Sequence, residues 1–188
     1  GIIKWSFGKK TMLTMKSYRG KSRHMTCKEN YLMNIFVVDN NPVTAALQLC
    51  DQHVVKMLIE NCQMLSAVFE DDFCGHPKSV HKHPCTLWLK ESKSNVSWLL
   101  WHHGTMLKEY THRYKKVHKY DKLDSVYHFT VLNQHSNLPD IPMTPFANAT
   151  PYKDIKDTVE AYRTFYNKDK SRFARWKYTN KPTWFMAS

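Results

Sequence analysis

The sequence predicts a mainly α-helical protein: a single compact domain of about three principal helices, with long ordered loops and a short N-terminal extended segment. Two observations lead to this prediction. Apolar residues recur at three- and four-residue steps over long stretches, which is the period of a helix with one buried face. The chain has 188 residues, of which 42% are hydrophobic, and is therefore long enough to bury one core without cross-links.

The extended segment is expected at residues 33–38, MNIFVV, whose apolar and partly β-branched side chains indicate a short buried strand or extended stretch. Asn41 and Pro42 then mark a helix start, because asparagine caps the first amide groups and proline suits the first helical position. The helical pattern continues to about Phe69. The apolar positions of this first helix are Val55, Leu58, Cys62, Leu65 and Phe69.

A second helix is predicted over about 86–118, with an interruption near Ser94, and its basic end complements the helix dipole. Residues 133–153 are expected to form an ordered irregular connection, because their prolines limit helix formation. A third helix is predicted to end near residue 167. The candidates for its N-cap are Asp154 and Asp157.

The charge is unevenly distributed along the chain. The formal net charge is +12, and residues 1–32 contribute +7 of it, with eight basic residues against one acidic residue. We therefore interpret 1–32 as a basic N-terminal extension, disordered or upstream of the true start, and 33–188 as the folded domain. An arm that orders on nucleic acid and a transit-like segment are the alternatives. The positive charge indicates a polyanionic partner, of which nucleic acid is the first choice. Because no apolar run reaches about 20 residues, no membrane-spanning helix is expected.

Several functional classes lack their motifs. The sequence contains no GxGxxG, no Walker loop and no GxSxG elbow, so we expect no nucleotide cofactor. Its five cysteines include no CxxC pair, which favours reduced thiols. The loop 74–85 contains cysteine and histidine, but in a spacing that matches no standard zinc site. We expect neither a metal nor any other cofactor.

One helical stripe contains candidate catalytic residues. His53, Lys56 and Glu60 are spaced i, i+3 and i+7, with Gln52 beside them and Asp51 nearer the apolar side. A solvated face with a Lys56–Glu60 ion pair would explain the pattern. Alternatively, Glu60 is a general base or stabilises a developing cation, and His53 binds phosphate or transfers a proton. The candidate catalytic residues are Glu60, His53 and Asp51.

Basic and aromatic residues supply the candidate nucleic-acid contacts. Cations neutralise phosphates, and flat rings stack on exposed bases. For Trp184 near the chain end, base stacking is the expectation, whereas other tail aromatics are expected to pack on the core. The full set of candidates is Gln52, Lys56, Lys82, His83, Lys90, Arg163, Arg172, Arg175, Lys177 and Trp184.

Four of these features together resemble a known family. MNIFVV at 33–38, CDQH at 50–53, Glu60, and KPTWF at 181–185 resemble the endonuclease V-type pyrimidine-dimer DNA glycosylases of bacteriophages. The resemblance spans roughly residues 33–188. It implies a compact helical fold that acts on double-stranded DNA without metal or cofactor. In that family the N-terminal amine attacks the sugar of the damaged nucleotide, a helix glutamate assists, and an imine intermediate leads to strand cleavage. Glu60 takes the place of that glutamate.

The chain also departs from the family pattern. Ile59 and Gln63 replace two arginines that flank the family glutamate, and the segment before DQH is about five residues longer. An amine at Gly1 would reach Glu60 only if the extension folded back, whereas a start at Met33 would place the amine on that residue.

The expectation is a monomeric, cytoplasmic (host cytoplasm if viral) DNA repair-type glycosylase, whose lyase activity depends on such an amine. The alternatives are a transferase or hydrolase on modified bases of phage DNA, and a non-catalytic nucleic-acid-binding protein.

Overall fold

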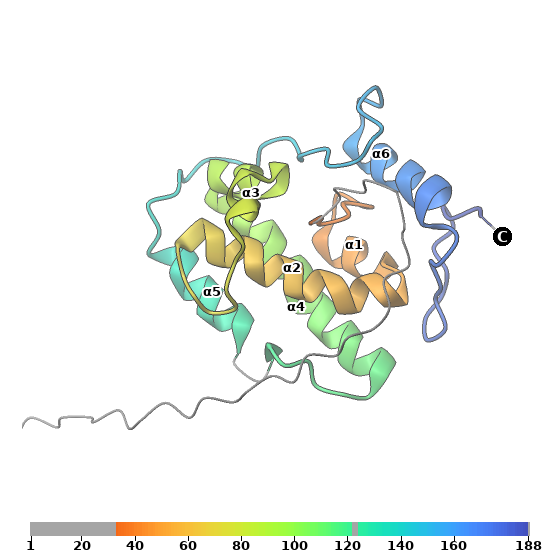
Figure 1. The fold of residues 1–188 in the computed structure, drawn as a ribbon, viewed down its shortest axis with the longest axis horizontal. Helices are drawn as coiled ribbons and strands as arrows, with labels where there is room; N and C mark the ends of the chain where they lie inside the picture. The colour runs from red at the N-terminus through yellow and green to blue at the C-terminus, as the bar shows by residue number, and fades with distance from the viewer. Residues whose placement is uncertain (1–32, 122–123, 188) are drawn as a thin grey trace, which may run out of the picture. The chain divides into compact units, whose positions relative to one another are not determined.

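The computed structural model describes residues 33–121 and 124–187, and within them it is helical with no β-strand (Figure 1). The predicted mainly α class is therefore confirmed, while the predicted extension 1–32 lies outside the described residues. A 3₁₀ helix at Lys78–Lys82 precedes α3, and a π-helical turn at Tyr166–Lys170 continues α6. The six α-helices are α1 (Pro42–Gln48), α2 (Asp51–Phe69), α3 (Pro84–Glu91), α4 (Lys93–Tyr114), α5 (Ser125–Gln134) and α6 (Thr158–Phe165).

The first predicted helix is in fact two. Asn41 caps α1 as predicted, accepting hydrogen bonds from the amides of Val43 and Thr44, and Pro42 is the first helical residue. The chain then becomes extended at Leu49 and Cys50 before α2 begins. The prediction of one continuous helix was wrong. The break leaves main-chain carbonyls near the end of α1 free for a donor from α4, which local sequence does not reveal.

The second predicted helix also divides. Ser92 is extended between α3 and α4, where its hydroxyl accepts from the amide of Ser94 at 3.0 Å and donates to the carbonyl of Ile141 at 2.6 Å. The predicted interruption near Ser94 is thus close to the observed break. Helix α4 ends at Tyr114, and Lys115 takes the left-handed conformation that closes it.

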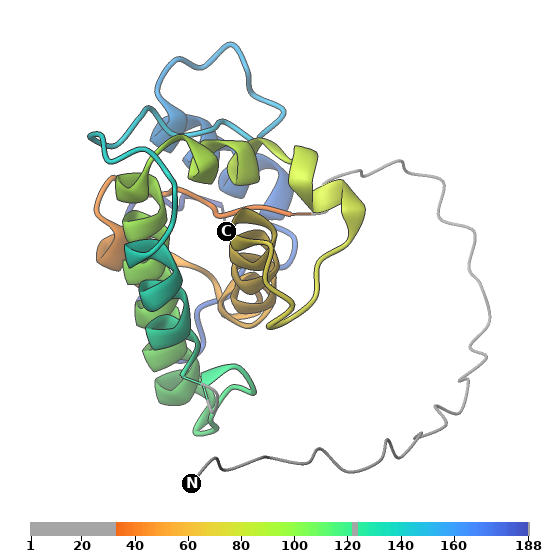
Figure 2. The ribbon, with the colours of Figure 1, turned by 90° about the vertical axis from the view of Figure 1, so that its left-hand side faces the viewer.

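Helix α5 was not predicted, because its sequence SVYHFTVLNQ is rich in β-branched and aromatic residues. It lies along α4 (Figure 2). Gly104 of α4 faces Val126 of α5: a Cβ at that glycine would lie 3.5 Å from the valine side chain. This packing, rather than helix propensity, stabilises the element.

Helix α2 contributes much of the core and contacts α3, α4 and α5. Its side chains at Val54, Leu58, Cys62 and Leu65 are fully buried. Residues 33–38 are buried without forming a strand, and the stretch is irregular rather than fully extended, since the amide of Val38 donates to the carbonyl of Phe36 at 2.8 Å.

The C-terminal part follows the predictions closely. Residues 135–157 contain no regular element, and Asp157 caps α6 by accepting from the amide of Glu160 at 3.0 Å. The tail then packs back onto α1, where Trp176 donates to the carbonyl of Gln48 at 3.0 Å. No helix in the described ranges is long and apolar enough to cross a bilayer.

Candidate active site

Glu60 lies on α2 with only 5% of its surface exposed. Its Oε2 accepts a hydrogen bond from the main-chain nitrogen of Asn34 at 2.9 Å, and its Oε1 lies 3.1 Å from Lys56 Nζ. Burial raises the pKa of Glu60, and the Lys56 ammonium and the Asn34 amide act against that rise. The predicted Lys56–Glu60 ion pair is present. Because Glu60 is buried, the pair does not lie on a fully solvated face of α2, as the alternative interpretation of this stripe required. A buried carboxyl with a raised pKa is suited to proton transfer near neutral pH.

The extended segment is fixed against this carboxylate by its own side chains. Asn34 Nδ2 donates to the carbonyl of Ala149 at 3.4 Å, and Asn34 Oδ1 accepts from the amide of Phe36 at 3.1 Å. Phe36 has a φ of 46°, an unfavourable backbone conformation for a bulky residue. The surrounding packing maintains this strain and fixes the nitrogen of residue 34 beside Glu60.

His53 occupies the interior rather than the surface. Its imidazole stacks on Phe36, with ring centroids 4.1 Å apart, and its Nδ1 forms a hydrogen bond with the hydroxyl of Tyr166. Burial lowers the pKa of His53 to about 3, so the ring is neutral at pH 7. A buried neutral ring offers phosphate little access and no charge, so this geometry does not favour the expected phosphate contact of His53.

We expect the Tyr166→Phe variant to lose about 1–3 kcal/mol of unfolding free energy, because it leaves the His53 nitrogen buried without its partner. The same hydroxyl accepts from the amide of Cys50 at 3.4 Å, so a second polar group loses its partner. Denaturant unfolding measures the loss. Tyr178→Phe, at a half-exposed tail residue, is the matched control, and equal stability of the two variants would contradict the prediction.

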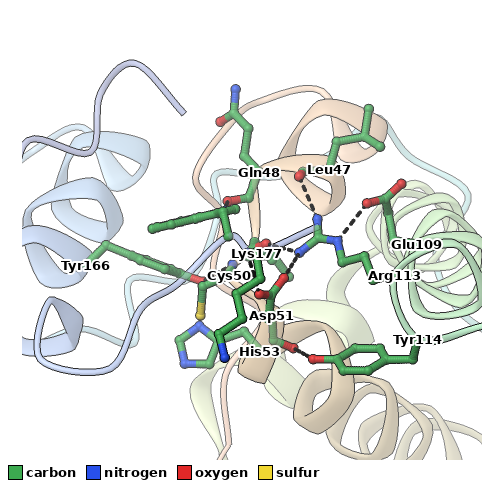
Figure 3. Close-up of polar contacts among 12 residues, drawn as sticks. Leu47, Gln48, Cys50, Asp51, His53, Glu109, Arg113, Tyr114, Tyr166 and Lys177 are labelled. Atoms are coloured by element: carbon green, nitrogen blue, oxygen red, sulfur yellow. Dashed lines mark hydrogen bonds and ion pairs between the residues drawn. The ribbon is translucent and has the colours of Figure 1, made fainter. Parts of the chain in front are cut away.

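Asp51 is held in a buried ion pair, not in a reactive position (Figure 3). Its Oδ1 lies 3.2 Å from Arg113, and its Oδ2 accepts from the main-chain nitrogen of Lys177 at 2.8 Å. These contacts give Asp51 a structural role, and its catalytic role stays a prediction. Its two oxygens join the end of α4 and the C-terminal tail to the start of α2.

The burial of Arg113 was not predictable from the sequence, because this residue stands among other cations at the end of a helix. Its guanidinium is fully buried and makes four polar contacts (Figure 3). Two of them satisfy carbonyls at the break between α1 and α2. Its partners are Leu47 O at 3.0 Å, Leu49 O at 2.7 Å, Asp51 Oδ1 at 3.2 Å and Glu109 Oε2 at 2.8 Å.

The predicted nucleic-acid contacts divide into exposed and partly buried residues. Lys90 is partly buried on α3. His83 caps α3, with Nδ1 accepting from the amide of Cys85 at 3.2 Å, and burial lowers its pKa. Arg163 donates to the carbonyl of Val38 at 2.9 Å. The exposed candidates are Gln52, Lys56, Lys82, Arg172, Arg175 and Lys177.

Trp184 does not present a free ring for base stacking. Its Nε1 donates to Gln48 Oε1 at 2.7 Å, and its ring packs edge-on against Tyr166 at 5.5 Å. The Arg163 guanidinium lies 5.7 Å from the same ring. These contacts anchor the tail through Trp184, and base stacking by its ring stays a prediction.

The loop of cysteine and histidine residues does not gather into a ligand set. His76 Nδ1 and His81 Nε2 lie 3.0 Å apart as a hydrogen-bonded pair. Within the part of the chain that the structure describes, no three metal-ligating side chains are placed to hold an ion.

Comparison with known proteins gives one match. The model of the pyrimidine dimer DNA glycosylase family matches residues 33–122. No curated protein and no solved structure matches the chain. The matched segment contains the extended stretch, α1 to α4, Glu60 and its Asn34 partner, whereas the KPTWF motif lies beyond it. Residues 33–122 are thus similar to the pyrimidine dimer DNA glycosylases, in agreement with the family that the sequence resembles.

Proposed function

We propose that this protein is a DNA repair glycosylase that releases a damaged or modified base from double-stranded DNA, acting as a monomer in the cytoplasm. The family match supports a glycosylase that acts on damaged bases. The observation that carries the proposal is the buried Glu60 carboxylate, 2.9 Å from the main-chain nitrogen of Asn34. The double-stranded substrate, the monomeric state and the location are part of the proposal.

Base release breaks the bond between the sugar C1′ and the base nitrogen, and positive charge develops on the sugar. A carboxylate stabilises that charge, and a protonated carboxyl can donate to the departing base. The target nucleotide must leave the helical stack to reach Glu60. The Oε1 atom of Glu60 faces Lys56, whose side chain is 61% exposed, so the substrate is proposed to approach from this side.

Strand cleavage requires a free amine at the same place. In the full chain the nitrogen of Asn34 is an amide and cannot attack C1′. An amine on residue 33 or 34 would lie within reach of Glu60. It would form the N–C1′ bond as the base departs with a proton, and opening of the sugar ring would give the imine that leads to elimination. We propose lyase activity for such a form of the protein.

The Glu60→Gln variant tests the role of the carboxyl. We expect base release from a duplex with one pyrimidine dimer to fall about 100- to 10,000-fold, because glutamine cannot exchange a proton. Binding of the same duplex is expected to stay close to that of the wild type. Glu70→Gln makes the same chemical change at the exposed end of α2 and serves as the control. Unchanged turnover in the Glu60 variant would remove this residue from the mechanism.

Borohydride reduction separates the proposed lyase from its rivals, because only an imine-forming enzyme becomes covalently attached to DNA. Intact mass of the natively expressed protein identifies its first residue alongside this assay. Base release without trapping would indicate a hydrolase or transferase. Salt-sensitive binding without any product would indicate a non-catalytic DNA-binding protein.

A further inference from the structure

Lys153 lies in a tightly built loop between α5 and α6. The Oδ1 atom of Asn148 accepts from the amide and the hydroxyl of Thr150, at 3.0 and 2.6 Å. Asn148 Nδ2 donates to the carbonyl of Tyr152 at 3.0 Å. The Nζ of Lys153 donates to the carbonyl of Asn148. The main-chain amide of Lys153 donates to the carbonyl of Pro151. The exposed ammonium is therefore held at one place rather than moving freely on its stem.

The same loop reaches the candidate active site. The carbonyl of Ala149 accepts from Asn34 Nδ2 at 3.4 Å, and Asn34 donates its main-chain hydrogen to Glu60. The Cys85 thiol is within electrostatic range of both the Glu60 carboxylate and the Lys153 ammonium. The loop of Lys153 is therefore part of the neighbourhood of Asn34 and Cys85, although Lys153 and Glu60 are 93 positions apart in the chain.

The two lysines of this neighbourhood differ in their counter-ions. Lys56 pairs with Glu60 at 3.1 Å. Lys153 forms no ion pair with a carboxylate of residues 33–121 or 124–187. An exposed cation fixed by a main-chain carbonyl and lacking a carboxylate partner is ready to bind an anion, and the anion that a nucleic acid offers is phosphate.

We propose that Lys153 binds a DNA phosphate next to the nucleotide that is held at Glu60. This proposal rests on the proposed function. It adds a contact from the loop between α5 and α6 to the one expected from Lys56 on α2, so that phosphates are held by two separate elements of the fold. The sequence did not single out Lys153, because it stands in a proline-limited connection without a basic run.

The salt dependence of DNA binding tests the proposal. For Lys153→Gln, the slope of log K against log salt is expected to decrease in magnitude by about 0.9, which corresponds to the loss of one phosphate contact. The ratio of the wild-type affinity to the variant affinity should then change about eightfold for a tenfold change in salt. Lys108→Gln removes the same charge from an exposed position on α4 and is expected to leave the slope unchanged. A slope for Lys153→Gln equal to the wild-type slope overturns the proposal.

Neutral phosphates locate the contact. The affinity of the wild type and of Lys153→Gln is measured for a set of duplexes. In each duplex one phosphate beside the dimer is replaced by an uncharged methylphosphonate. At one flanking position the difference between the two proteins is expected to disappear, and a difference that persists at every flanking position overturns the proposed location. Base release by the wild type is measured separately, so failure of the proposed function and failure of the Lys153 contact give different results.

Discussion

Replacing Arg113 with methionine is expected to lower the free energy of unfolding by about 3–5 kcal/mol, because it leaves the Asp51 carboxylate buried without its cation. The guanidinium is fully buried and also donates to the carbonyls of Leu47 and Leu49, so the break between α1 and α2 loses its donors too. Methionine fills similar space, and the loss therefore reflects the polar contacts more than a cavity.

Urea unfolding followed by circular dichroism measures this effect. Arg175→Met is the matched control, because Arg175 is exposed and its guanidinium donates to the nearby carbonyls of Ser171 and Ala174. Adding Asp51→Asn to Arg113→Met should recover part of the loss, since it removes the unpaired charge. Equal stability of the Arg113 and Arg175 variants would show that the buried network contributes little.

Lowering the pH from 7 to 5 is expected to remove about 6 kcal/mol of stability, because three buried histidines have a pKa lowered to about 3 in the folded state. Burial lowers the pKa of His53, His102 and His103 to about 3 in each case. Below the unfolded pKa of about 6.5 the unfolded chain binds protons that the folded chain does not, so each histidine contributes about 2 kcal/mol of loss by pH 5. The stability is complete above pH 6.5 and is lost progressively below it.

Glu60 acts in the opposite direction, since a carboxyl with a raised pKa binds its proton more readily in the folded state, but it is one group against three. The expected loss is comparable to the whole stability of a typical domain, so unfolding near pH 5 is the expected observation.

Unfolding free energies between pH 7 and pH 5 check this prediction. Their slope near pH 5 should correspond to the uptake of about three protons, or about 4 kcal/mol per pH unit. His102→Phe should reduce the uptake to about two, because the phenyl ring can keep the stacking of His102 on Trp98. A stability that stays level down to pH 5 would contradict the prediction for all three histidines.

The sequence by itself determined the features that depend on contacts within a few residues. The caps at Asn41 and Asp157 are local hydrogen bonds to amides two or three positions ahead, and the sequence shows both partners. The apolar period of α2 and the ion pair between Lys56 and Glu60 likewise arise within single helical turns. The helical class and the prominence of Glu60 followed from these local patterns.

Only the tertiary structure decided which polar groups are buried and where helices break. The break at Leu49 depends on a guanidinium 64 positions away, and the break at Ser92 depends on a carbonyl 49 positions away. The burial of His53 and Asp51, the anchoring of Trp184, and the contact of Asn34 with the loop of Lys153 also come from segments far apart in the chain. A residue's type and spacing predict the bonds that it can form within a turn. Whether its polar atoms meet water, phosphate or a buried partner is set by what packs against it.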